Sequence, residues 1–225
     1  MASEAHEHDA KAQPRPTRER GKQLERVNAF SDGVFTIAAT LLVLSIELPT
    51  GPADELGGKL ADLLDPTFSY FLSFAVIGRF WLRHHELFGR LRFSDQRFAA
   101  LNLVFLAFIA ILPAPTELLG RYPDRTEPVV IYAANLIVLT LLLRMITKDA
   151  VDRGLTDGAP LTSKVGRDVG LWVVGVFAVS IPVAFVVPRA AVYIWIVAAF
   201  APMVSRRLNR GGGDASGSDG VEPAG

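Results

Sequence analysis

Long apolar stretches recur along this chain, and short charged segments separate them. A helix needs about 20 predominantly apolar residues to cross the hydrocarbon core of a bilayer. The pattern therefore predicts an all-α membrane protein with six transmembrane helices per chain. We place the six spans at Val27–Leu48, Pro66–Leu87, Phe98–Leu119, Val129–Thr147, Val169–Val187 and Ala190–Val204.

Polar segments flank the predicted spans. Residues 1–22 have mixed charge and lack the apolar core of a signal peptide, and residues 209–225 are rich in glycine and serine. Segments of this composition cannot bury enough apolar surface to fold. We therefore expect disordered cytoplasmic tails at 1–22 and 209–225, on either side of one six-helix transmembrane channel domain at 23–208.

Basic residues are distributed unevenly between the predicted loops. Most of the 23 Lys and Arg residues lie in the N-terminal tail, between spans two and three, between spans four and five, and after span six. The remaining loops hold only Lys59, Arg121, Arg125 and Arg189. Because loops rich in Lys and Arg stay in the cytoplasm, we predict a multi-pass plasma-membrane protein with both termini cytoplasmic.

Composition excludes several classes of function. The 23 basic residues are balanced by 23 acidic ones, so the chain lacks the basic excess of a nucleic-acid-binding protein. Without cysteine it can form neither disulfides nor sulfur-ligated zinc sites. It also has no Gly-x-Ser-x-Gly elbow, His-Glu-x-x-His motif or phosphate loop. We predict neither an enzyme nor a cofactor or metal site.

The first predicted span carries an acidic residue, Asp32. A carboxylate in a membrane helix is costly unless it has a partner or faces water. The sequence offers five candidate partners, which are Arg26, Arg79, Arg83, His84 and His85. From the residues alone we favour a charge pair that clamps the first helix to the second over direct contact with a transported ion.

An apolar stripe follows Asp32 along the same helix. At helical periodicity one face carries Phe30, Ile37, Leu41, Leu44 and Leu48, and Thr40 lies beside them. Such spacing by itself favours a packing face over a pore lining. Glu47, near the end of the span, is either a residue that gathers cations or a solvated interface residue.

The stretch "RVNAFSDGVFTIAATLLVL" resembles the first helix of the transmembrane protein 175 family of potassium channels. The family signature, Arg followed after three residues by Phe-Ser-Asp, is matched here by Arg26, Phe30, Ser31 and Asp32. "FWLRHHELF" at Phe80–Phe88 resembles the second helix, and "LNLVFLAFIAILPAPTELLG" at Leu101–Gly120 is similar to the third. The likeness covers roughly residues 20–208.

This resemblance implies a prokaryotic-type member with one six-helix unit per chain, assembled in membrane lipid as a homotetramer with the first helices around a central pore. It implies that K⁺ is the permeant ion and that the pore is constricted at Ile37, Thr40, Leu41 and Leu44. It also implies a network that organises the pore helix, formed by Arg26, Phe30, Ser31, Asp32, Trp81, His84 and His85. Adjacent helical residues point in different directions, so only one of the two histidines can face this network, and the sequence leaves open which one.

The predicted function is a potassium-permeable cation channel constricted by hydrophobic rings. The chain has no Thr-Val-Gly-Tyr-Gly loop, so rings of backbone carbonyls are not the expected selectivity device. The alternatives are a secondary transporter and a non-conducting membrane scaffold. Many transporters show paired internal repeats, and no such repeat is evident in this sequence.

Overall fold

The computed structural model describes residues 16–52, 56–158, 175–188, 190–192 and 194–195. These residues form helices and loops, and the only ladder pairing among them is an isolated bridge between Leu91 and Thr156. The order is α1 (Pro16–Leu41), the 3₁₀ helix η1 (Leu42–Ser45), α2 (Leu56–Ala61), α3 (Leu64–Phe88), α4 (Gln96–Ala110), α5 (Pro113–Arg121) and α6 (Thr126–Asp152). A further apolar helix covers Gly175–Ala184.

Among the described residues, four helical segments are long and apolar enough to cross a membrane. They are Gly21–Ser45, Gly57–Phe88, Gln96–Arg121 and Thr126–Asp152, and they match the first four predicted spans. Residues 169–174 and 196–204 of the fifth and sixth predicted spans lie outside the described part of the chain, as do residues 1–15 and 209–225 of the predicted tails. The all-helical class is confirmed with four candidate spans.

The first helix is longer than its apolar part. It begins at Pro16, so it extends into the segment that the sequence assigned to a tail. Proline is favoured at the start of a helix because it has no backbone N–H to leave unpaired. The Arg, Glu, Lys and Gln residues that follow are good helix formers, which explains why the helix begins well before the hydrophobic stretch.

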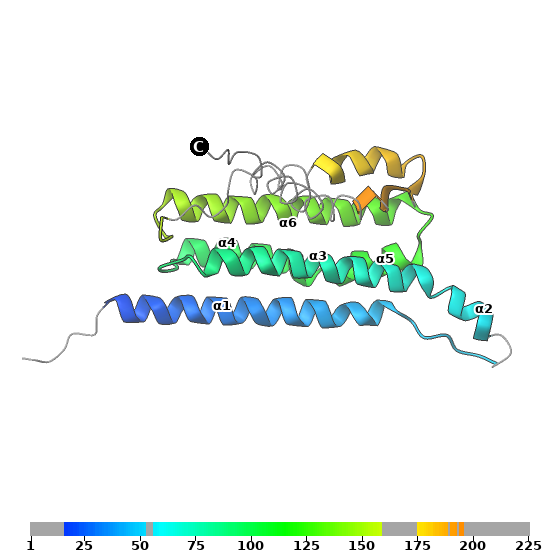
Figure 1. Cartoon of the computed structure of the whole chain (residues 1–225), viewed down its shortest axis with the longest axis horizontal. Helices are drawn as coiled ribbons and strands as arrows, with labels where there is room; N and C mark the ends of the chain where they lie inside the picture. The colour runs from blue at the N-terminus through cyan, green and yellow to red at the C-terminus, as the bar shows by residue number, and fades with distance from the viewer. Residues whose placement is uncertain (1–15, 53–55, 159–174, 189, 193, 196–225) are drawn as a thin grey trace, which may run out of the picture.

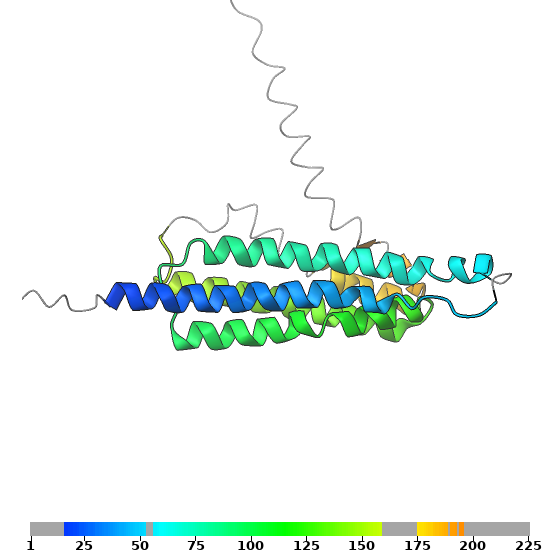
Figure 2. The same cartoon turned by 90° about the horizontal axis from the view of Figure 1, so that it is seen from below.

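The long helices lie side by side and run nearly parallel to one another (Figures 1 and 2). α1 packs against α3 and α4, and η1 packs against α5. Behind this layer, α6 packs against α4 and α5. Because α1 lies at one side of the bundle, one of its faces is left uncovered by the described helices (Figure 1).

A proline divides the third span. α4 ends at Ala110, a turn follows, and α5 begins at Pro113. Proline cannot donate to the preceding turn, which explains a break at this position. At the other end of α5, a Cβ on Gly120 would lie 2.8 Å from the Cα of Pro66. The absence of a side chain at Gly120 therefore permits α3 and α5 to pack closely.

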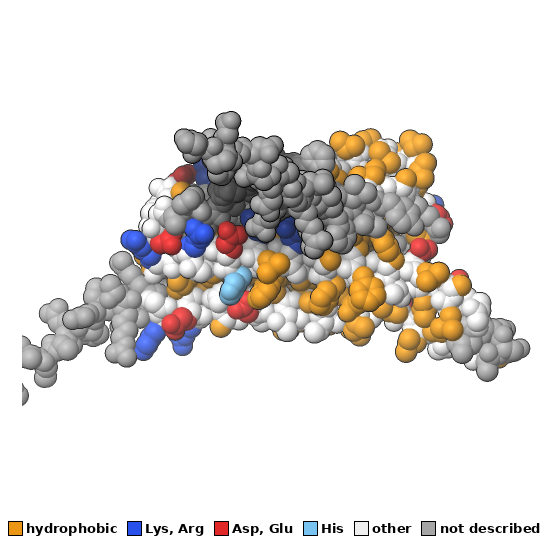
Figure 3. Space-filling model, in the orientation of Figure 1, with side chains coloured by type: hydrophobic (Ala, Val, Ile, Leu, Met, Phe, Trp, Pro, Cys, Tyr) orange, Lys and Arg blue, Asp and Glu red, His pale blue; other side chains and the backbone are white. Residues whose placement is uncertain are grey.

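The surface of the bundle is divided by side-chain type. Apolar side chains gather along the middle of the face shown in Figure 3, and many charged side chains gather toward the end at which α1 begins. Exposed large apolar residues on this bundle include Phe71 and Phe74 of α3. A contiguous exposed apolar surface of this kind is typical of contact with lipid or with another protein chain.

Candidate pore helix and its polar network

One face of α1 is buried against the rest of the chain. Ser31, Phe35, Ala38 and Leu42 follow one another at steps of four, three and four residues, and each is at most 3% exposed. This spacing puts all four on one side of a helix. The face that fixes α1 to its own bundle is therefore a different one from the apolar stripe singled out in the sequence.

The apolar stripe lies on the exposed face of α1 and η1. Phe30, Ile37, Leu41 and Leu44 are all exposed, Ile37 to 59% and Leu44 to 70%. The stripe is therefore largely uncovered by the described residues of its own chain.

Thr40 shares this exposed face. Its hydroxyl donates to the carbonyl oxygen of Ile37 at 2.9 Å, within the same helix. The single hydroxyl proton is therefore used locally, and the oxygen lone pairs remain free to accept. Thr40 thus contributes an acceptor oxygen to an otherwise aliphatic surface.

On the buried side, a chain of hydrogen bonds connects α1, α4 and α3. The Ser31 hydroxyl donates to the Val27 carbonyl at 2.8 Å, and Asn102 Nδ2 donates to Ser31 Oγ at 2.9 Å. Asn102 Oδ1 lies 2.8 Å from His84 Nε2. Because Asn102 uses its amide N–H toward Ser31, its oxygen accepts from an Nε2–H of His84. We call Ser31, Asn102 and His84, together with Asp32 and Trp81, the α1 network.

The structure decides which histidine faces this network. His84 is 1% exposed, and its ring stacks on Phe88 at a centroid distance of 4.2 Å and meets Phe35 edge-on at 5.4 Å. His85 is exposed and stacks on Trp81 at 5.3 Å. The inward histidine is therefore His84, whereas the exposed ring of His85 stacks on the ring of Trp81.

Asp32 is held by neutral donors. Trp81 Nε1 donates to one carboxylate oxygen at 3.0 Å, and Asn28 Nδ2 donates to the other at 3.3 Å. From the sequence we expected a cationic partner for Asp32. However, Arg83 pairs with Glu86, and His84 bonds to Asn102. The expected clamp between α1 and α3 is present, but an indole N–H makes it. The indole avoids the desolvation cost of a second charge.

The signature residues divide between the two sides of α1. Ser31 and Asp32 take part in contacts within the chain, whereas Arg26 and Phe30 are exposed on the side of Ile37. Among the described contacts, neither Arg26 nor Phe30 belongs to the network of the single chain. Their positions leave them available to other molecules.

A second buried polar group, which we did not predict from the sequence, lies elsewhere in the bundle. Ser73 of α3 lies 2.9 Å from the hydroxyl of Tyr132 in α6 and 2.8 Å from the hydroxyl of Thr116 in α5. Thr116 also lies 2.8 Å from the Leu112 carbonyl, and Trp195 stacks on Tyr132 at 5.1 Å. We call Ser73, Thr116 and Tyr132 the hydroxyl cluster. Its only signal in the sequence is hydroxyl residues within apolar spans.

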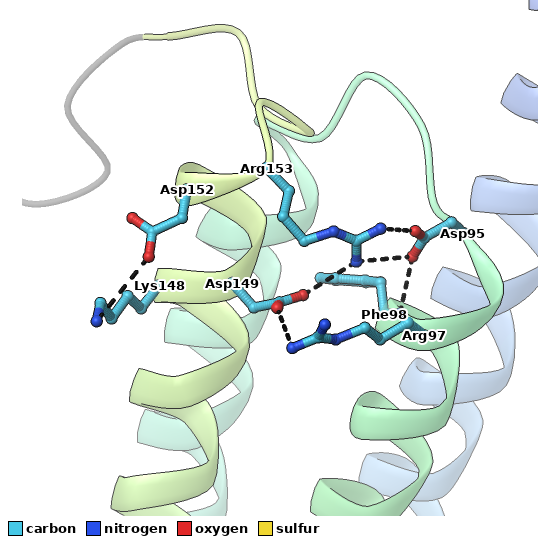
Figure 4. A network of polar contacts seen from close by, with 7 residues as sticks. All are labelled: Asp95, Arg97, Phe98, Lys148, Asp149, Asp152 and Arg153. Carbon is cyan, nitrogen blue, oxygen red and sulfur yellow. Dashed lines mark hydrogen bonds and ion pairs between the residues drawn. The ribbon is translucent and has the colours of Figure 1, made fainter.

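Charged residues tie the start of α4 to the end of α6 (Figure 4). The Arg153 guanidinium lies between Asp95 and Asp149, bonding Asp149 at 3.1 Å and pairing with Asp95. Arg97 reaches Asp149 at 2.8 Å, and Asp95 caps α4 by accepting from the Phe98 N–H at 2.9 Å. The Arg153 guanidinium and then the Phe98 N–H lower the pKa of Asp95. We call Asp95, Arg97, Asp149 and Arg153 the loop clasp.

No group of three or more His, Asp or Glu side chains able to hold a metal ion occurs within the described part of the chain.

Thr140 and Thr147 of α6 donate to their own helix backbone, and Asn135 donates to the Phe108 carbonyl of α4 at 3.3 Å. Asn102 and Asn135 thus both connect helices.

Comparisons with known proteins bear on this arrangement. The family described as "Endosomal/lysosomal potassium channel TMEM175" matches residues 26–113, which run from the signature through α4. A protein from Streptomyces collinus named as a potassium channel is 39% identical over 123 residues, covering 52% of this chain and 59% of the relative. One from Chamaesiphon minutus, also named as a potassium channel, is 36% identical over 131 residues, covering 56% and 64%.

A solved structure extends the likeness along the chain. The crystal structure of a lysosomal potassium-selective channel TMEM175 homolog from Chamaesiphon minutus aligns with a TM-score of 0.68 and 27% identity. The alignment covers 84% of this chain and 98% of that one. Residues 26–113 thus match the TMEM175 family model, and most of the chain shares the fold of a TMEM175 homolog.

These matches agree with the resemblance read from the sequence. The matched residues include both sides of α1, the Trp81–His85 segment and Asn102. The family is described as a channel and not as an enzyme. The chain spans less than two thirds of the length of the two curated relatives.

Proposed function

We propose that this chain is the subunit of a potassium-permeable channel whose pore is lined by α1 from several copies. The observation that carries the proposal is the exposed stripe of Ile37, Leu41 and Leu44 on a helix whose opposite face is anchored by polar contacts. The names of the bacterial relatives support K⁺ as the ion.

The constriction in this proposal is aliphatic. Rings of Ile37 and Leu41 offer no ligand oxygens, so a narrow ring dewets and closes, whereas a wider one stays wet and conducts. K⁺ holds its hydration water less tightly than Na⁺, so partial dehydration at such a ring favours K⁺. The free lone pairs of Thr40 supply one acceptor per copy beside the ring.

The α1 network acts as the positioning device. Ser31, bonded to Asn102, sets the rotation of α1, and Asp32 bonded to Trp81 fixes its distance from α3. Arg26 and Phe30 lie on the same side as the stripe, and we assign them to contacts between copies. The assembly we propose is a homotetramer in membrane lipid.

The orientation follows from the charges. Several Lys and Arg side chains gather at the end of the bundle where α1 begins (Figure 3). We assign that end to the cytoplasm and the protein to the plasma membrane, with both termini cytoplasmic.

Potassium flux from proteoliposomes tests the proposal. The purified chain should pass K⁺ without a second substrate, whereas a secondary transporter requires exchange or coupling and a scaffold passes nothing. Ile37→Asn should raise the flux or reduce the preference for K⁺ over Na⁺, because a polar side chain wets the constriction. Leu41→Asn should act in the same direction.

The matched control is Leu103→Asn, which places the same substitution at an apolar α4 residue exposed to 52%. This variant should fold and conduct like the original chain. If Ile37→Asn and Leu103→Asn change the flux equally, α1 does not line the pore. If the unmodified chain passes no K⁺, the channel function itself is wrong.

A further inference from the structure

An ion pair lies where the chain leaves η1. Glu47 comes three residues after Leu44, at the end of the exposed stripe, and its carboxylate pairs with the guanidinium of Arg121. Arg121 is the last residue of α5, the helix against which η1 packs. The same guanidinium lies 3.7 Å from Glu117, one turn earlier in α5.

This group carries more negative than positive charge. Two carboxylates share one guanidinium, which leaves one net negative charge per copy. All three side chains are between 45% and 68% exposed. Exposed ion pairs contribute little to stability, typically about 0–1 kcal/mol, so the stability of the fold does not account for this arrangement.

We propose that Arg121 sets the charge at one mouth of the pore by neutralising Glu47, and so limits the local concentration of permeant cations. The inference rests on the proposed function, because it assigns the end of the exposed stripe to a pore mouth. It goes beyond that function by naming a residue outside α1 that controls the rate of permeation. Arg121 draws Glu47 toward α5, and its loss frees that carboxylate.

Screening by salt gives the proposal a specific signature. The Debye length is about 30 Å at 0.01 M ionic strength and about 3 Å at 1 M. A ring of uncompensated carboxylates therefore concentrates cations at the mouth in dilute salt and has almost no effect in concentrated salt. A structural defect in the pore would alter conduction in both.

Single-channel conductance in planar bilayers tests this, with KCl at about 0.01 M and about 1 M. Arg121→Gln should raise the conductance on the order of twofold in dilute KCl and leave it unchanged in concentrated KCl. Glu47→Gln should lower it under the same dilute condition. The double variant Arg121→Gln with Glu47→Gln has the original formal charge, so it should conduct like the unmodified chain.

Two further variants serve as controls. Arg121→Lys keeps the charge and should preserve the conductance. Arg125→Gln removes one positive charge from a residue that pairs at 2.8 Å with Glu127 and not with Glu47, and it should have a smaller effect.

The proposal is overturned if Arg121→Gln leaves the dilute-salt conductance unchanged, if its effect persists in concentrated KCl, or if Arg125→Gln acts equally. If Arg121→Gln does not fold, Glu47→Gln decides, and an unchanged conductance would reject the proposal. These results differ from an unmodified chain that conducts no K⁺, which would reject the channel function.

Discussion

The α1 network and the hydroxyl cluster are both polar groups within an apolar bundle, but they are built differently. The α1 network contains a carboxylate, an imidazole and an amide, and it contacts α1. The hydroxyl cluster contains only hydroxyl groups and connects α3, α5 and α6. Hydroxyls are the less costly way to connect helices, whereas ionisable groups in a membrane usually mark function.

The two groups also differ in whether every polar atom has a hydrogen-bond partner. The hydroxyl cluster ends on the Leu112 carbonyl, so each hydroxyl has a partner. In the α1 network, Nδ1 of His84 is buried with no hydrogen-bond partner among the described residues. A buried polar atom without a partner lowers the stability of the fold. The α1 network therefore holds a fixed arrangement beside α1 at some loss of stability. Two predictions test this contrast and a third tests the loop clasp, in order of decreasing effect.

The largest effect is expected in the hydroxyl cluster, from Tyr132→Ala. Tyr132 is fully buried and stacked on Trp195, so its removal leaves a large cavity. The free energy of unfolding should fall by about 3–5 kcal/mol. Thermal unfolding in detergent measures this loss. Ile131→Ala is the control, because Ile131 is next to Tyr132 in the chain but its side chain is 49% exposed. Equal losses in the two variants would contradict the assigned packing.

A smaller loss of stability but a larger change in conduction is expected from Asn102→Leu. The substitution removes the partner of Ser31 and leaves the Nε2–H of His84 unpaired, which costs about 1–3 kcal/mol. Because α1 loses its anchor, K⁺ flux per folded protein should also change.

Two variants provide the comparison for Asn102→Leu. Asn135→Leu removes a bond from α6 to the Phe108 carbonyl, and Tyr132→Phe removes one hydroxyl from the hydroxyl cluster. Both should lower stability while the flux per folded protein stays normal. If all three variants alter flux alike, the α1 network has no special relation to the pore.

The smallest effect is expected in the loop clasp, from Asp95→Asn. Asparagine can still cap α4, so the change removes mainly the charge that faces Arg153. Because the pKa of Asp95 is lowered in the fold, its carboxylate stabilises the fold above the ordinary carboxyl pKa. That contribution is lost as the pH falls through the lowered value.

The gap in melting temperature between Asp95→Asn and the unmodified chain should therefore be present at neutral pH and close on acidification. Asp152→Asn is the matched control, because Asp152 pairs only loosely with Lys148 at 3.9 Å. A gap that is independent of pH would show that the charge of Asp95 does not stabilise the loop clasp.

Much of the fold could be predicted from hydrophobic pattern. Residue type and position are enough to indicate the four spans and the break before Pro113. They also indicate that Asn102 and Asn135 connect helices. The helical start at Pro16 was missed because span prediction detects apolar residues, whereas polar residues also favour helix.

The partners of the site residues were harder to predict. From the residues alone, a carboxylate in an apolar span suggested a cationic partner, and only the family resemblance put Trp81 in the same network as Asp32. Nothing in the local sequence distinguishes His84 from His85, because both follow Trp81 within one turn. The hydroxyl cluster was missed because Ser and Thr in a membrane helix usually bond to their own backbone.

By itself the sequence determined the helical class, the first four spans and the periodic stripe on α1, because these depend on local composition and on helical period. Only the tertiary structure decided which side of α1 is buried, which histidine is inward and which neutral donors hold Asp32. Those choices depend on where α3 and α4 lie around α1. Their placement results from packing between segments distant in the chain, which the period of a single helix does not encode.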